Sequence, residues 1–271
     1  ALEEGVVKDG DTYVCKGFET VADYKLKCHV FSTIGSHGSL TVEQALMNSC
    51  NPYMIHLALE MGNSRFAYYQ SLFGFGKITG IDLPGETTGI VYGDRMTTID
   101  AACNSFGQTI NVNMMQMMAA YCSIINGGML YQPHIVKRIE SANGEVVKEY
   151  KANLVRQTIT ASTSKLLRRY LKNTVEEGTA KKAGVTGYSV AGKTGTAQKG
   201  DRKDNKWIIS FIGHAPAENP KFAIYVVIDE PYGTTGTSGS SADVLTLTHN
   251  ILEKLLPYMN VYKDASDEYE D

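Results

Sequence analysis

The sequence lacks a bias of charge, and this absence excludes several classes of partner. Its 271 residues carry 26 Lys and Arg against 29 Asp and Glu, a formal net charge of −3. Proteins that bind nucleic acid or anionic membrane surfaces usually carry a basic excess. We therefore expect no nucleic-acid partner. A content of 43% hydrophobic residues is that of a folded protein with a core.

Long apolar runs and a secretion signal are also missing. The longest uncharged stretch, residues 101–136, contains several Asn and Gln side chains that would be left unpaired in hydrocarbon. No basic start is followed by the apolar segment of a signal peptide. Because Ala1-Leu2-Glu3-Glu4 has no initiator Met and is typical of a helix interior, we expect the chain to be a fragment.

Cysteine is scarce, and its spacing is not that of a zinc module. The five cysteines include no C-x-x-C pair, whereas zinc modules usually draw their ligands in close pairs. The nearest approach to a ligand set is Cys28-His29, with Cys15 and His37 nearby. We interpret the thiols as free and mostly buried, and we expect no metal and no cofactor. A Cys15–Cys28 disulfide stays open, because it depends on the redox compartment.

Helical patterns fill the middle of the chain. Thr41-Val42-Glu43-Gln44 matches a capping box, which begins a helix. Asn51-Pro52 is typical of an N-cap followed by Pro at the first helical position, so a second helix begins there and ends at Gly62. Further helices are predicted over residues 66–73, 114–125 and 162–175.

Three strand patterns follow near the C-terminus, over residues 189–198, 207–215 and 222–229. Short connections make them an antiparallel meander. A terminal helix closes at Pro257, and the acidic tail from Asp264 is expected to be disordered. The sequence therefore predicts an α+β protein, with an antiparallel sheet flanked by helices and a helical subdomain.

Residues 187–194 match G-x-x-x-x-G-K-T, the phosphate-binding loop of P-loop NTPases. That loop requires a helix immediately after the Lys-Thr pair, so that the helix N-terminus faces the phosphates. The residues that follow Thr194 include Gly195 and Gly200 and show no apolar period. We keep a P-loop NTPase only as a distant alternative.

Interpreted as a strand, Lys193-Thr194-Gly195-Thr196 suits the binding of a carboxylate. Alternation places the hydroxyls of Thr194 and Thr196 on one side, and Gly195 lets a ligand approach the backbone. Lys193 supplies positive charge, and an N–H group on an open strand edge can stabilise an oxyanion. The simpler alternative is an edge strand whose Lys prevents aggregation.

Together, Ser49-Cys50-Asn51 and Lys193-Thr194-Gly195 resemble the S-x-N and K-T-G motifs of penicillin-binding proteins and serine β-lactamases. Further segments, taken in the order in which they occur along the chain, resemble a class B penicillin-binding protein transpeptidase domain of the division or sporulation type. These segments are residues 45–52, 73–76, 79–86, 105–108, 125–128, 177–180, 190–198 and 210–213.

This resemblance implies the penicillin-binding protein/serine β-lactamase-like fold over residues 1–263. It implies a helical part over residues 39–180 and a sheet part over 181–260, with residues 264–271 as the tail. The family's third motif, S-x-x-K, occurs only at Ser162–Lys165, between the other two, whereas the family places it first. The resemblance therefore places the nucleophilic Ser and its Lys upstream of Ala1, and we expect this chain to be inactive alone.

The resemblance further implies a peptidoglycan D,D-transpeptidase that acts through an acyl-serine and binds β-lactams. Ser49 would relay a proton to the leaving group, and Asn51 would hydrogen-bond the substrate amide. Lys193 would tune Ser49 and attract the terminal carboxylate, which the hydroxyls of Thr194 and Thr196 would bind. The backbone N–H of Thr196 would form half of the oxyanion hole.

The partners implied are the D-Ala-D-Ala stem peptide, β-lactam antibiotics and, through the parent protein, membrane proteins of division or sporulation. The location implied is the extracytoplasmic face of the bacterial cell membrane, with an N-terminal anchor outside this chain. A non-catalytic β-lactam sensor of the same fold is the main alternative.

Overall fold

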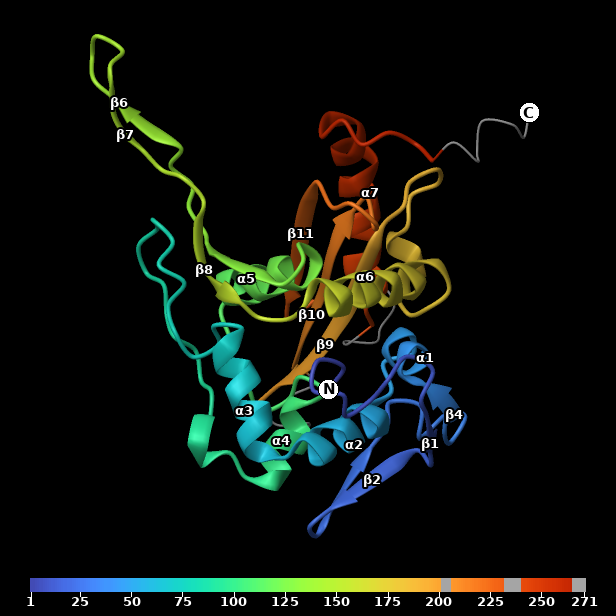
Figure 1. Ribbon diagram of the computed structural model, residues 1–271. Coiled ribbons are helices and arrows are strands. Elements are labelled where there is room, and N and C mark those ends of the chain that lie inside the picture. Colours follow the sequence, from blue (N-terminus) through green and yellow to red (C-terminus); the bar gives the residue numbers. More distant parts are fainter. Residues whose placement is uncertain (201–205, 232–239, 265–271) are drawn as a thin grey trace, which may run out of the picture.

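A three-stranded antiparallel sheet forms the centre of the computed structural model, which describes residues 1–200, 206–231 and 240–264. Its strand order is β11 (Phe222–Asp229), β10 (Lys206–Ala215) and β9 (Ala191–Lys199). Figure 1 shows α7 (Ala242–Tyr258) on one side of this sheet, with α5 (Met114–Ile125) and α6 (Ala161–Glu176) on the other. The predicted meander is confirmed. Of the tail expected at residues 264–271, all but Asp264 lie outside the described residues, and the Asp264 N–H donates to the Gly187 carbonyl at 2.8 Å.

The N-terminal 41 residues form two small two-stranded sheets beside short helices. β1 (Thr12–Cys15) pairs with β4 (Gly38–Thr41), and β2 (Phe18–Val21) pairs with β3 (Tyr24–Lys27). The helices that follow are α1 (Val42–Met47), α2 (Asn51–Met61), α3 (Asn63–Leu72) and α4 (Thr98–Asn104), with short 3-10 turns at Gly93–Arg95 and, later, Lys181–Ala183. None of the described helices is both long enough and apolar enough to cross a membrane.

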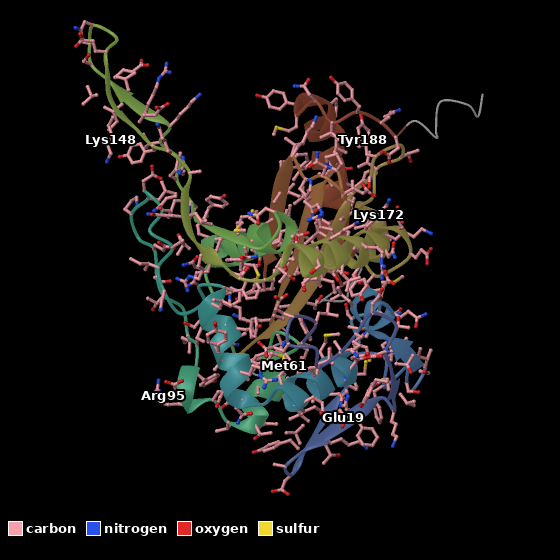
Figure 2. The ribbon with its side chains drawn as sticks, in the orientation of Figure 1. Glu19, Met61, Arg95, Lys148, Lys172 and Tyr188 are labelled. Atoms are coloured by element: carbon pink, nitrogen blue, oxygen red, sulfur yellow. The ribbon has the colours of Figure 1, made fainter. Side chains whose placement is uncertain are left out.

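A hairpin projects from the body of the molecule (Figure 1). β5 (Met129–Gln132) pairs with β8 (Asn153–Gln157), and beyond them β6 (Arg138–Glu140) pairs with β7 (Val146–Glu149). Figure 2 places Lys148 on this arm, far from Lys172 on α6. Every residue of β6 and β7 is exposed, so the arm adds little to the core.

The helix starts follow the local sequence, with one exception. The capping box at α1 is confirmed, since the Gln44 backbone N–H donates to Thr41 Oγ1 and the Thr41 N–H donates to the Gln44 side chain. The expectation that Asn51 caps α2 is wrong. Cys50 has the extended backbone of the N-cap position, and Asn51 is the first helical residue. The Asn51 amide instead donates to the carbonyl of Lys27, at 3.4 Å.

The ring of Phe211 fills the core where β9 and β10 meet. Phe211 is fully buried, among residues that include Ile209 and Leu252. A Cβ atom at Gly192 would lie 2.3 Å from the Phe211 ring, and one at Gly213 would lie 2.5 Å from it. The two glycines therefore leave room for the ring, which packs closely against both strands.

His214 is fully buried in β10 and has a partner on each ring nitrogen. Nε2 lies 3.1 Å from the carbonyl oxygen of Ala217, and Nδ1 lies 2.8 Å from the hydroxyl of Tyr121. Because a carbonyl oxygen only accepts, Nε2 carries the proton and Nδ1 accepts from Tyr121. Burial lowers the pKa of His214 to about 4, so the ring is neutral in the folded protein at pH 7.

This buried ring predicts a loss of stability in acid. Below the unfolded pKa of about 6.5, the unfolded chain binds a proton on His214 that the folded chain excludes until about pH 4. We expect the free energy of unfolding to fall by roughly 2–3 kcal/mol from this group between pH 7 and pH 4.5. Urea unfolding of wild type and His214→Gln at both pH values measures it. An equally steep loss in His214→Gln would contradict the assignment.

Candidate active site

Ser49 lies in the tight turn between α1 and α2. Its φ is +52°, in the left-handed region that residues other than Gly seldom adopt. Two backbone bonds close the turn, from the Ser49 N–H to the Leu46 carbonyl at 3.2 Å and from the Cys50 N–H to the Ala45 carbonyl at 2.9 Å. The turn therefore fixes the direction in which the Ser49 hydroxyl points.

Lys193 reaches this hydroxyl from β9. Its Nζ donates a hydrogen bond to Ser49 Oγ across 144 positions of sequence, and it lies 3.2 Å from the carbonyl oxygen of Thr194. Burial lowers the pKa of Lys193 to about 8, because removing an ammonium from water disfavours its charged form. An amine with a pKa near neutral can both hold and exchange a proton during a reaction.

Thr179 is a site residue that the sequence analysis does not single out. Its Oγ1 lies 3.3 Å from Thr194 Oγ1, and its backbone N–H donates to the Met47 carbonyl at 3.1 Å. Gly178 allows this approach, since a Cβ there would lie 2.8 Å from the carbonyl oxygens of Met47 and Thr174. The only sequence signal is that residues 177–180 resemble a segment of the family, and this resemblance alone assigns no role to Thr179.

The outer edge of β9 is open to a ligand. Among the strands that the structure describes, β9 pairs only with β10. Thr196 is exposed there, and Thr194 is half-buried with its Oγ1 at 3.3 Å from Lys193 Nζ. Gly195 has a second reason to be Gly besides ligand approach, because a Cβ would lie 2.5 Å from Ser210 Oγ on β10.

Asn51 and the S-x-x-K residues Ser162 and Lys165 make no hydrogen bond to Ser49 or Lys193 among the described contacts. The Asn51 amide is bonded to Lys27, as described above, instead of to Ser49 or Lys193. Ser162 and Lys165 are exposed at the start of α6, where Ser162 Oγ lies 2.9 Å from Thr160 Oγ1. This S-x-x-K therefore lies on a solvent-exposed part of the helix.

The structure also lacks the loop that a nucleotide site would need at Gly192-Lys193-Thr194. These residues lie inside β9, which continues to Lys199, so no helix begins immediately after Thr194. Since a P-loop holds phosphate with loop N–H groups ahead of a helix N-terminus, residues 187–194 do not form a P-loop.

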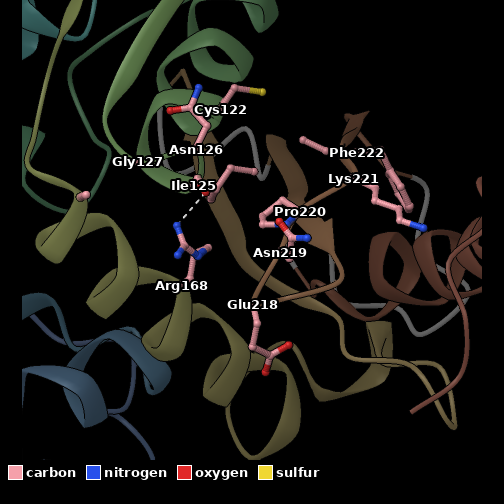
Figure 3. A pocket seen from close by; sticks show the side chains of 12 residues that line it. Cys122, Ile125, Asn126, Gly127, Arg168, Glu218, Asn219, Pro220, Lys221 and Phe222 are labelled. Atoms are coloured by element: carbon pink, nitrogen blue, oxygen red, sulfur yellow. Dashed lines mark hydrogen bonds between the residues drawn. The ribbon is translucent and has the colours of Figure 1, made fainter. Parts of the chain in front are cut away.

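A cavity of about 590 Å³ lies away from the Ser49–Lys193 pair. Figure 3 shows its wall, built from α5, α6 and the segment that leads into β11. Arg168 crosses it and donates to the Ile125 carbonyl at 2.9 Å. Ser49, Asn51 and Lys193 are absent from its lining, so this cavity is separate from the candidate site.

Similarity to known proteins shows the family of the chain. The family model described as the penicillin binding protein transpeptidase domain matches residues 1–253. Stage V sporulation protein D of Bacillus subtilis is 39% identical over 267 residues, which cover 96% of this chain and 41% of that protein. Peptidoglycan D,D-transpeptidase FtsI of Escherichia coli K12 is 31% identical over 271 residues, covering 98% of this chain and 43% of that protein.

Among solved structures, penicillin binding protein 3 of Mycobacterium tuberculosis in complex with aztreonam matches with a TM-score of 0.85 and 28% identity. The match covers 97% of this chain and 60% of that one. This chain thus spans less than half the length of the two curated relatives above. By the family match, its motif order and its fold, the chain belongs to the penicillin-binding protein transpeptidase domain family.

Proposed function

We propose that this chain is the transpeptidase domain of a peptidoglycan D,D-transpeptidase that acts on D-Ala-D-Ala stem peptides and is acylated by β-lactams. The contact between Lys193 Nζ and Ser49 Oγ carries the proposal, because it joins a lysine of lowered pKa to a hydroxyl at an open strand edge. Relatives point the same way, since FtsI is named a peptidoglycan D,D-transpeptidase and the matched structure holds aztreonam.

The proposed reaction starts with a serine hydroxyl attacking the carbonyl carbon of the penultimate D-Ala. The C–N bond to the terminal D-Ala breaks, and the departing nitrogen takes up a proton. Ser49 can deliver this proton, because its hydroxyl donates while it accepts a bond from Lys193. The amine of a neighbouring stem peptide then attacks the acyl-enzyme, which forms the cross-link and frees the serine.

The same edge of β9 is proposed to bind the end of the peptide. Lys193 supplies positive charge for the terminal carboxylate, and the hydroxyls of Thr194, Thr196 and Thr179 supply hydrogen bonds. The Thr196 N–H is assigned to the oxyanion that forms at the attacked carbonyl. Asn51 would bind the substrate amide after its own amide leaves the Lys27 carbonyl.

The attacking serine is proposed to belong to the S-x-x-K segment that the family order places ahead of S-x-N. The site would then work in a protein anchored at the outer face of the bacterial membrane. Its proposed partners are membrane proteins of division or sporulation, in keeping with the names of its relatives.

Labelling with a fluorescent penicillin tests the proposal. We expect the protein lengthened at its N-terminus through S-x-x-K to form a covalent adduct, and the 271-residue chain to form none. Mass spectrometry of the labelled peptide locates the acyl group. Stable acylation of the 271-residue chain at Ser162 would overturn the assignment.

A second assay separates the enzyme from a β-lactam sensor of the same fold. The lengthened transpeptidase is expected to release D-Ala from a stem pentapeptide in the presence of an acceptor amine. Acylation by penicillin without any release of D-Ala would identify a sensor instead.

A further inference from the structure

Three cysteines and one histidine from separate segments meet at one point beside the candidate site. Cys15 ends β1, Cys28 follows β3, His37 precedes β4, and Cys50 stands directly after Ser49. Their sulfur and nitrogen ligand atoms all lie within 4.8 Å of one another. His37 Nδ1 is 3.5 Å from Cys28 Sγ and 4.0 Å from Cys15 Sγ.

These distances fit a tetrahedral zinc site. Bonds of about 2.3 Å to sulfur and 2.0 Å to nitrogen place neighbouring ligand atoms of a tetrahedron about 3.5–3.8 Å apart. The cluster needs only a small contraction to reach that geometry. Three thiolates and one imidazole favour zinc over magnesium or calcium, which prefer oxygen ligands.

The cluster is closed, as structural zinc sites are. Cys15, Cys28 and Cys50 are at most 3% exposed, and His37 is half-buried. Four protein ligands complete the coordination sphere, which leaves no open position for a substrate or water. The role that this geometry supports is therefore structural rather than catalytic.

Backbone N–H groups point at the sulfur atoms. The Gly17 N–H donates to Cys15 Sγ at 3.4 Å, and the N–H groups of Val30 and Asn51 donate to Cys28. Such bonds stabilise thiolates and orient metal ligands.

The loops that hold these ligands are tied together. The Cys28 N–H donates to the Gly17 carbonyl at 2.8 Å. Gly17 has a φ of +87°, and a Cβ there would lie 2.0 Å from the carbonyl oxygen of Gly35, so no other residue fits this position. The sequence neighbour His29 is engaged elsewhere, because its Nε2 lies 2.9 Å from the Asn48 carbonyl oxygen.

We propose that Cys15, Cys28, His37 and Cys50 bind one structural zinc ion that fastens the two small N-terminal sheets to the Ser49 turn. These two-stranded sheets, β1–β4 and β2–β3, have strands of only four residues, which are marginal without further support. A metal bond at Cys50 would also hold the backbone on which Ser49 and Asn51 stand. This effect on the turn rests on the proposed function, whereas the binding of zinc does not.

Metal analysis of the 271-residue chain, purified with reductant and zinc, tests the proposal. We expect one equivalent of zinc per chain. Removal by a strong chelator should lower the thermal midpoint, and added zinc should restore it. Substitution with cobalt should give the strong visible absorption of a tetrahedral, sulfur-rich site. Metal-free protein that keeps the same midpoint and takes up no cobalt would overturn the proposal.

Variants of His37, the half-buried ligand, test zinc binding without removing a buried core residue. His37→Ala should weaken zinc binding by at least about 100-fold in competition with a chelating dye, and His37→Cys should restore it as a four-cysteine site. Cys103→Ser with Cys122→Ser removes the two thiols outside the cluster and should leave one zinc bound. Equal zinc loss in this control variant, or unchanged affinity in His37→Ala, would contradict the ligand assignment.

The alternative to zinc binding is oxidation of two of these thiols to a disulfide. Non-reducing peptide mapping distinguishes free thiols from a disulfide. Free thiols in the metal-free chain support the zinc site. A Cys28–Cys50 or Cys15–Cys28 bridge in purified protein that carries no zinc would overturn it. In the lengthened protein, acylation that slows when zinc is removed and recovers when zinc is added back would connect the metal to the Ser49 turn.

Discussion

Replacing Lys193 with alanine is expected to slow the acylation of the lengthened protein by a β-lactam about 100- to 1,000-fold, measured as the second-order rate constant. The substitution removes the group that donates to Ser49 Oγ and the positive charge beside Thr194. Both contacts face the charge that develops in the reaction, in a buried setting where electrostatic interactions are strong. The loss should therefore appear in the rate and not in the fold.

Lys199→Ala is the matched control on the same strand. The side chain of Lys199 is 40% exposed and pairs with Asp229 and Glu230 at 2.9 Å, so its removal should change the rate less than about threefold. Lys193→Arg should stay slow, because a guanidinium remains charged and differs in shape from an amine. A Lys193→Ala protein that acylates as fast as Lys199→Ala would remove Lys193 from the mechanism.

Removing the ring of Phe211 is expected to lower the free energy of unfolding by about 3–5 kcal/mol. The ring is fully buried between β9, β10 and α7, and it lies against Gly192 and Gly213. Phe211→Ala leaves a cavity directly behind the residue that precedes Lys193. Urea unfolding measures the loss, and the acylation rate should fall as well because β9 is no longer held firmly.

Two further variants calibrate this effect. Phe211→Leu keeps most of the apolar contact and should cost about 1–2 kcal/mol. Val147→Ala, on the projecting hairpin, removes an apolar side chain that is 67% exposed and should change stability by less than about 0.5 kcal/mol. A Phe211→Ala loss as small as that of Val147→Ala would show that the ring does not support the sheet.

Local sequence signals predicted much of the fold. The capping box at Thr41 and the alternating strands around Phe211 depend on residues a few positions apart, so their structure follows from neighbours. The cap of α2 was mistaken because a backbone carbonyl 24 positions away, that of Lys27, accepts from the Asn51 side chain. Such a partner is invisible to a pattern of adjacent residues.

The site was predictable only in part. The meeting of Ser49 with Lys193 follows from the family resemblance, since nothing local links residues so far apart. Thr179 was not predicted, because loops bring its hydroxyl to Thr194 from a distant position. The sequence named Cys15, Cys28 and His37 as the nearest approach to a ligand set but included His29, whereas the structure brings Cys50 to the group and leaves His29 bonded to the Asn48 carbonyl.

The long separation of Ser49 and Lys193 also has a consequence for protein synthesis. A ribosome adds about 5–20 residues per second, so Lys193 is made roughly 7–30 s after Ser49. During that interval the helical half of the chain exists without the strand that completes its site. The proposed site therefore cannot assemble on a nascent chain until translation has passed β9.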